Sequence, residues 1–165
     1  MRNANPFSLS LADYLVAAGW LTYVEMPLGS VTMNEHTQRA DVLAFKKSYH
    51  LQAVIYEVKQ SRGDFLADVN SGKYLGYFKV ARRVVFAYPQ GMVKAAEVPP
   101  ECGIITHSAK GWHAGRSGHP QGVPSPPYEV LLACLFRGYR EEQGSRVLRN
   151  RINLEDNVAL AERAK

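Results

Sequence analysis

The sequence predicts an α/β protein with a mixed central β-sheet flanked by helices, and three features support this class. Two β-type runs, at about 39–45 and 53–59, are joined by the short hydrophilic segment "KKSYHL". A third run, "RRVVFAYP", is rich in β-branched and aromatic residues and is closed by Pro89. Between the second and third runs, "SRGDFLADV" and "KYLGYFKVA" have helical spacing. Strands that alternate with helices in this way are typical of α/β sheets.

The first elements are expected to be a short helix and a strand. In "SLADYLVAAGW", Ser10 and Asp13 form a capping pair at the start of an amphipathic helix, which ends at Gly19. The following "LTYVEMPLG" alternates as a strand does. Tyr23 and Glu25 are therefore expected on one face, with the residues on either side of Glu25 on the other.

The later elements include a helix, a hairpin and a linker. Ser61 and Asp64 form a second capping pair, which predicts a helix that begins at Ser61 and breaks at "NSG". The segment "CGIITHSAKGWHAG" predicts a hairpin with its turn at 109–111. Glycine and proline mark "GRSGHPQGVPSPP" as a linker. The sequence thus predicts a core domain at 1–120, with a linker and C-terminal helices at 121–165 that pack on the core or on a partner.

Composition indicates a basic protein with one ordinary core. The chain has 165 residues, of which 46% are hydrophobic. Its net charge of +5 favours a polyanionic partner such as nucleic acid, with a mildly basic protein that binds none as the alternative. Cys102 and Cys134 fit no zinc or redox spacing, so free thiols and a cytoplasmic location are expected. No segment has the features of a signal peptide or a membrane span.

Three charged residues lie within the two neighbouring β-type runs. If these runs pair as an antiparallel hairpin centred on Tyr49, Asp41 lies opposite Glu57. Two carboxylates that face each other at ~4.5–5.5 Å between Cβ atoms repel unless a positive group lies between them. Lys59 is two residues beyond Glu57 and so projects from the same face. The pattern therefore predicts two carboxylates and an ammonium on one patch of a sheet.

Such a patch suits a hard divalent cation. Mg²⁺ is usually held by one or two carboxylates together with water and substrate phosphate oxygens, and Mn²⁺ can substitute for it. A cation there polarises a phosphodiester and lowers the pKa of a bound water. Metal-dependent phosphodiester hydrolysis is the reaction that this arrangement favours.

The same residues resemble a known family. Asp41, followed after fifteen residues by "EVK" at 57–59, resembles the active-site signature of the PD-(D/E)XK nuclease superfamily, whose restriction-endonuclease-like fold carries the acid and the E-x-K on neighbouring strands. The series "YVEMPL", "RADVLAF", "IYEVKQSRGDFLAD", "KYLGY", "VVFAYP" and "VPPECGIITHS" is similar to the MmcB-like DNA-repair nucleases over most of 21–113. The residue before Asp41 is Ala40, where the signature has proline.

The resemblance implies roles for particular residues. Asp41 and Glu57 would be metal ligands, with the Val58 carbonyl as a third, and Lys59 would orient the attacking water. Glu25 matches an acidic residue placed ahead of the Asp and would complete the catalytic group. The residues implied in substrate binding are Gln60, Ser61, Arg62, Lys73 and Tyr74.

Other interpretations compete with these roles. Glu57 and Lys59 could be a solvent-facing pair on an edge strand. Ser61 is explained equally by helix capping, and Tyr74 by burial in the core. Three histidines at 107, 113 and 119, with Cys102 nearby, suggest a zinc site, but their spacing matches no familiar ligand pattern.

Two functions follow from the sequence. The first is a Mg²⁺- or Mn²⁺-dependent DNA endonuclease, nicking or structure-selective, that acts in repair, replication or defence, with RNA not excluded as a substrate. The alternative is a catalytically silent nucleic-acid-binding accessory subunit with a nuclease fold. In either case the C-terminal helices would serve a homodimer or a larger repair or replication complex.

Overall fold

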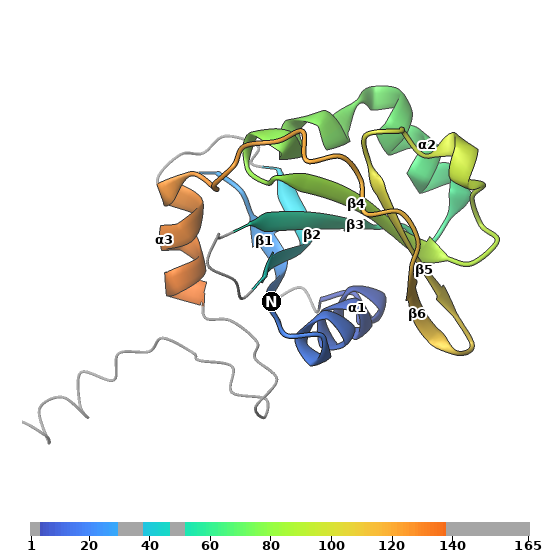
Figure 1. Ribbon diagram of the computed structural model, residues 1–165, viewed down its shortest axis with the longest axis horizontal. Helices are drawn as coiled ribbons and strands as arrows, with labels where there is room; N and C mark the ends of the chain where they lie inside the picture. Colours follow the sequence, from blue (N-terminus) through green and yellow to red (C-terminus); the bar gives the residue numbers. More distant parts are fainter. Residues whose placement is uncertain (1–3, 30–37, 47–51, 138–165) are drawn as a thin grey trace, which may run out of the picture.

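The computed structural model describes residues 4–29, 38–46 and 52–137, and these form one six-stranded mixed β-sheet flanked by helices (Figure 1). In chain order the elements are α1 (Pro6–Ala17), β1 (Trp20–Pro27), β2 (Arg39–Lys46), β3 (Ala53–Val58), α2 (Arg62–Ser71), the 3₁₀ segment η1 (Lys73–Lys79), β4 (Arg83–Pro89), the 3₁₀ segment η2 (Ala95–Glu97), β5 (Gly103–Ser108), β6 (Gly111–Ala114) and α3 (Tyr128–Arg137). The predicted α/β class is confirmed.

The strands lie in the sheet in the order of the chain. β1, β2 and β3 are antiparallel, β3, β4 and β5 are parallel, and β6 returns antiparallel to β5. A parallel pair needs a long crossover, and α2 with η1 supplies the one between β3 and β4. This crossover places α2 directly over the end of β3.

Helices cover both faces of the sheet. In Figure 1, α2 lies above the sheet and α1 below it. Below, Leu11 and Leu15 of α1 pack with Val42 of β2. Above, Phe65 of α2 packs with Ile55 of β3. Both cores are closed by alternate residues of the same strands, as the period of two requires.

The predicted register between β2 and β3 is confirmed. The ladder pairs Val42 with Tyr56 and Phe45 with Ala53. Continuing the ladder by one residue sets Asp41 opposite Glu57, as a hairpin centred on Tyr49 predicts. The loop residues 47–51 lie outside the described part of the chain.

The predicted start of α1 is wrong. The helix begins four residues before Ser10, because Asn5 caps it by accepting a hydrogen bond from the Phe7 N–H at 2.9 Å and Pro6 occupies the first turn. Ser10 instead accepts a hydrogen bond from the indole N–H of Trp112 at 3.1 Å. The predicted end is correct, since Gly19 has φ of +84°.

The predicted alternation along β1 is also interrupted. Glu25 has a left-handed φ of +54°, which is unusual for a residue other than glycine. As a result Tyr23 and Met26 both reach the core above the sheet, although alternation would set them on opposite faces. The strand is therefore distorted next to Asp41.

The α2 helix and the hairpin agree with expectation. Ser61 caps α2 by accepting from the Asp64 N–H at 3.1 Å, and Gly72 ends it in the left-handed conformation. Ser108 pairs with Gly111, which gives the hairpin a two-residue turn. Of the predicted 121–165 segment, residues up to 137 are described, and the other predicted C-terminal helix lies outside them.

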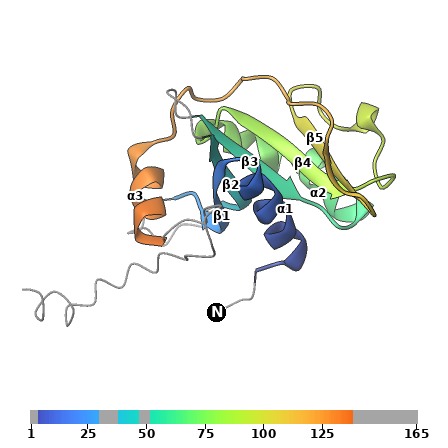
Figure 2. The ribbon, with the colours of Figure 1, turned by 60° about the horizontal axis from the view of Figure 1, so that its bottom comes forward.

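The described part of that segment packs on the core. Val130 and Cys134 of α3 are buried in the core above the sheet, and the Arg137 guanidinium donates to the Glu25 carbonyl at 2.6 Å. Figures 1 and 2 both show α3 at the end of the sheet formed by β1. Among the described helices, none has the length and apolar character needed to cross a bilayer.

Candidate active site

Asp41, Glu57 and Lys59 meet beneath α2, where β2 begins and the antiparallel β3 ends. Lys59 Nζ donates to Glu57 Oε1 at 3.0 Å. Asp41 Oδ2 accepts from the Val58 N–H at 2.8 Å, which ties the acid of β2 to the end of β3. The Lys59 N–H bonds to the Ala87 carbonyl of β4 at 2.8 Å, so the ladder holds the E-x-K segment on both sides.

The site is buried in the middle of the sheet. β3 is flanked by β2 and β4, and the side chains of Glu57 and Lys59 are only 2% and 9% exposed. The alternative of a solvent-facing pair on an edge strand is therefore wrong. A buried charge is costly unless it is paired, so the partners of these groups define the site.

Two further charged residues complete the cluster. Asp68 of α2 forms an ion pair with Lys59, and Lys73 Nζ lies 3.0 Å from Glu57 Oε1. Lys73 was expected near the site, but sequence reasoning missed Asp68. Its signal was its position three residues after Phe65, the fully buried residue of α2, which places both on the inner side of the helix.

Burial raises the pKa of both carboxyl groups of the site. Burial raises the pKa of Asp41, and the hydrogen bond from the Val58 N–H opposes that rise. Burial also raises the pKa of Glu57, and the negative charge of Asp41 adds to it. Both acids thus ionise less readily than usual, which is the effect that an added cation would reverse.

The partners of Glu57 strongly favour their charged forms. Burial of Lys59 disfavours the ammonium, but the charges of Glu57 and Asp68 outweigh it and raise the pKa of Lys59. Burial likewise opposes the ionisation of Asp68, but Lys59 outweighs it and lowers the pKa of Asp68. Lys59 and Asp68 are therefore a charged pair at neutral pH.

Asp41 and Glu57 supply part of the ligand set of a divalent cation, which water and substrate oxygens would have to complete. Glu57 Oε2 is buried and accepts no hydrogen bond from a described residue. With Asp41 on the neighbouring strand, it offers the two carboxylates that Mg²⁺ commonly takes. In the described ranges, no group of three or more His, Cys, Asp or Glu side chains is arranged to hold a metal. The role of the Val58 carbonyl stays a prediction.

Glu25 is close enough to affect Asp41 but is held elsewhere. Its carboxylate forms an ion pair with Arg39 at 2.7 Å, and its negative charge contributes to the raised pKa of Asp41. Its left-handed φ lies beside the site, where backbone strain is often found in functional regions. Glu25 does not join Asp41 and Glu57 in a three-carboxylate group.

Three of the predicted substrate-binding residues, Ser61, Arg62 and Tyr74, make structural contacts outside the charged cluster. Ser61 caps α2. The Arg62 guanidinium forms a two-bond ion pair with Glu97 of η2. Tyr74 is buried, and its hydroxyl donates to Glu101 at 2.8 Å.

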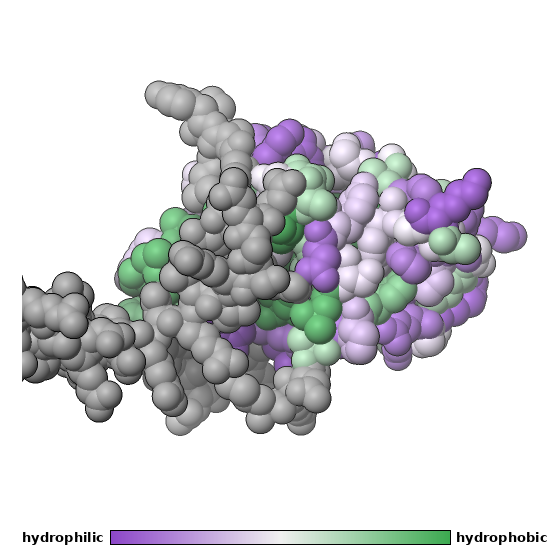
Figure 3. Space-filling model, turned by 90° about the horizontal axis from the view of Figure 1, so that it is seen from below, coloured by the Kyte–Doolittle hydropathy of each residue, from purple (hydrophilic) through white to green (hydrophobic). Residues whose placement is uncertain are grey.

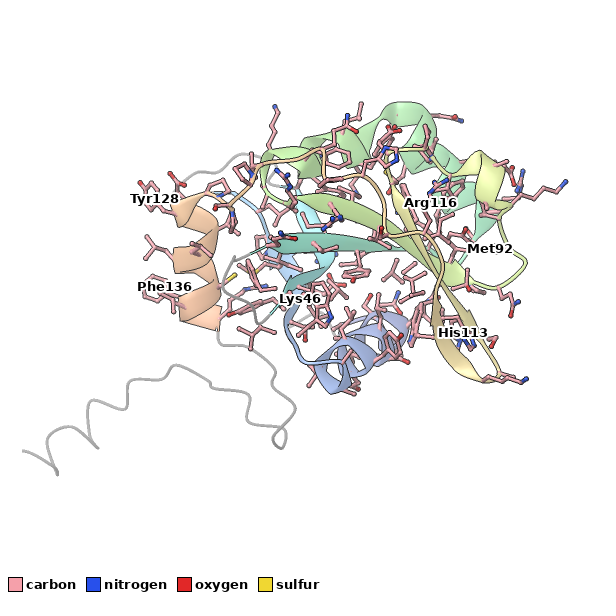
Figure 4. The ribbon with its side chains drawn as sticks, viewed as in Figure 1. Lys46, Met92, His113, Arg116, Tyr128 and Phe136 are labelled. Carbon is pink, nitrogen blue, oxygen red and sulfur yellow. The ribbon has the colours of Figure 1, made fainter. Side chains whose placement is uncertain are left out.

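Gln60 and the histidines lie away from the buried cluster. The Gln60 amide donates to Asn5 Oδ1 at 2.7 Å, at the start of α1 below the sheet. The His107 ring packs against Trp112, and His113 shares a 2.9 Å hydrogen bond with Ser108 on the hairpin. Figure 4 shows His113 on this hairpin, far along the sheet from α3.

The outer surface of α3 is apolar. Tyr128 and Phe136 are 69% and 72% exposed, and Figure 4 shows both pointing away from the sheet. Figure 3 shows hydrophobic residues, in green, on the described surface at this end of the molecule, beside more polar ones. Exposed apolar patches of this kind are common at interaction sites.

Comparison with family models and with curated proteins finds no match. Among solved structures, the chain is similar to the SPO1766 protein of unknown function from Silicibacter pomeroyi. The two are 19% identical, with a TM-score of 0.59 over 99% of this chain and 92% of that chain. At this identity the likeness concerns the fold alone. The chain is thus an α/β protein with a six-stranded mixed sheet flanked by helices. This protein carries a buried cluster of carboxylates and lysines where β2 begins and β3 ends in that sheet.

Proposed function

We propose that this protein is a metal-dependent DNA endonuclease that hydrolyses phosphodiester bonds at Asp41, Glu57 and Lys59. The observation that carries the proposal is the buried meeting of these three side chains at one end of neighbouring strands, with Glu57 Oε2 accepting no hydrogen bond from the described residues. The acid on one strand and the E-x-K on the next agree with a restriction-endonuclease-like core and with the resemblance to MmcB-like nucleases.

The residues divide the work by their chemistry. Asp41 and Glu57 would hold Mg²⁺ or Mn²⁺, which supplies Lewis-acid polarisation of the phosphodiester and a more acidic water when bound. Lys59 is charged and fixed between acids, so it can orient the attacking water and offset negative charge on the phosphate. Lys73 is 40% exposed and is the cation of the cluster that faces solvent, which suits a contact to the DNA backbone.

The test is a nicking assay with purified full-length protein. Supercoiled plasmid, single-stranded circular DNA and a branched duplex are incubated with Mg²⁺, Mn²⁺ or EDTA. We expect metal-dependent nicking that falls at least about 100-fold in Glu57→Gln and Lys59→Met, because both remove groups proposed at the reacting phosphate. Glu129→Gln on α3 and Lys110→Met at the hairpin tip are matched controls and should retain activity. Equal activity of all variants, or activity in EDTA, would contradict the proposal.

One observation favours the second function, a catalytically silent nucleic-acid-binding subunit. Glu57 Oε1 already accepts from both Lys59 and Lys73, so the cluster is largely neutralised without a metal. The apolar outer face of α3 would then recruit the protein to a homodimer or to a repair or replication complex. DNA binding without cleavage, unchanged in Glu57→Gln, is the result that this function predicts. Either function suits a basic cytoplasmic protein whose partner is DNA, with RNA as the alternative nucleic acid.

A further inference from the structure

Asp68 and Lys73 belong to the buried cluster but not to the E-x-K pattern. Asp68 lies on α2 and Lys73 begins η1, so both approach Glu57 from the layer above the sheet. Lys59 and Lys73 each lie 3.0 Å from the same oxygen, Glu57 Oε1. Both also pair with Asp68 Oδ2, Lys73 at 3.6 Å. The two ammonium groups are therefore shared between two carboxylates.

This sharing matters for any cation that binds Glu57. A divalent cation bound at Glu57 Oε2 would compete for the carboxylate charge that now holds two ammonium groups at Oε1. Of the two, Lys59 is buried, and a buried ammonium that loses its partner is strongly destabilising. Asp68 limits that loss, because it is already within reach of both Lys59 and Lys73.

The position of Asp68 is fixed by packing rather than by the cluster itself. Phe65, one turn earlier on α2, is fully buried and makes an edge contact with the ring of Phe86 on β4, with centroids 5.2 Å apart. This anchor sets the rotation of the helix. Asp68 is consequently held over the end of β3 whether or not Glu57 pairs with the lysines.

We infer that Asp68 is a positioning residue: it keeps Lys59 and Lys73 paired when Glu57 also binds a divalent cation, and it thereby sets the affinity of the site for that cation. The inference rests on the proposed function and deepens it. It also explains how a site whose acid is already paired with lysines can accept a metal.

The test measures Mn²⁺ affinity, with EPR of free Mn²⁺ as the readout, on the full chain without DNA. We expect Asp68→Asn to weaken binding by about 10- to 100-fold, the usual effect of removing a group that supports a metal ligand. Lys73→Met should tighten binding, and by a larger factor in the Asp68→Asn background, with a coupling of about 2- to 150-fold. Asp64→Asn on α2 and Lys79→Met on η1, both exposed in the structure, are matched controls and should leave the affinity unchanged.

The outcomes separate the inference from the proposed function. If the unchanged protein binds no Mn²⁺, the proposed function and the inference are both overturned. If it binds Mn²⁺ but the effects of Asp68→Asn and Lys73→Met are additive, only the inference is overturned, since a general charge effect would be additive. Unfolding by urea in EDTA verifies that each variant folds. If Asp68→Asn does not fold, Asp68→Glu should retain the affinity and Lys73→Met should still raise it, and failure of either overturns the inference.

Discussion

Replacing Lys59 by methionine should destabilise the protein in a pH-dependent way. The change keeps the length of the side chain but removes the ammonium that lies 3.0 Å from Glu57 and also pairs with Asp68. At an effective dielectric constant of ~20, opposite unit charges at that separation attract by about 5 kcal/mol before desolvation is considered. Removing one partner of a buried pair typically costs about 3–5 kcal/mol, because the other charge remains buried.

The expected cost here is smaller, since Lys73 still pairs with Glu57. Lys73 is 40% exposed and therefore compensates only in part. We expect Lys59→Met to lose about 2–3 kcal/mol at pH 8, just below the range for an uncompensated buried charge. Lys79→Met, an exposed change on η1, should lose no more than about 0.5 kcal/mol.

The sign of the pH dependence follows from the shifted acids. Burial already raises the pKa of Glu57, and loss of Lys59 raises it further. Burial opposes the ionisation of Asp68, and Lys59 is a main reason why its pKa is nevertheless lowered, so this pKa rises too when Lys59 is lost. The folded variant therefore binds protons more readily than the folded parent, and the difference in stability grows as pH rises. Between pH 5 and pH 8 the lysine itself stays charged.

Urea denaturation followed by circular dichroism, in buffer with EDTA, measures these free energies. The cost of Lys59→Met should be clearly smaller at pH 5 than at pH 8. A cost no greater than that of Lys79→Met would mean that the ion pairs contribute little. A cost that is larger at pH 5 would refute the electrostatic reasoning itself.

Two further changes test the elements that support the site. Ser61→Ala removes the cap of α2, because the Ser61 hydroxyl accepts from the Asp64 N–H, and it should lower the free energy of unfolding by about 1 kcal/mol in urea denaturation. The metal dependence of nicking should stay unchanged. Loss of DNA affinity would instead support Ser61 as a substrate contact. Gly122→Ala should lower the free energy of unfolding by about 1–3 kcal/mol in thermal or urea unfolding, because its Cβ would overlap the Ala81 carbonyl. Gly63→Ala, within α2, has space for a Cβ and should raise the free energy of unfolding by about 0.5–1 kcal/mol. A neutral Gly122→Ala would mean that the backbone contact with Ala81 relaxes easily.

The pairing of Asp41 with Glu57 could be predicted because strand periodicity and a short connection leave one plausible register. The distortion at Glu25 could not, since nothing in "YVEMPL" marks a left-handed residue. Asp68 was missed because the capping pattern predicts only where α2 begins; the signal for its side of the helix was the large apolar Phe65 three residues earlier. The early start of α1 was within reach, as Asn5 followed by proline is a strong cap signal.

The composition of the cluster itself is an argument for a chemical role. Buried ion pairs are often no more stabilising than apolar side chains of similar volume, so stability alone gives little reason to place charges at the end of β3. Glu57 stands opposite Phe86 in the parallel ladder, in surroundings that would accept an apolar residue. The charges are instead arranged so that one oxygen of Glu57 is paired twice, while the other is buried with no hydrogen-bond donor among the residues that the structure describes. A nuclease uses that free oxygen for a cation, whereas an accessory subunit has no use for it, and this difference is why metal affinity and cleavage need to be measured on the same variants.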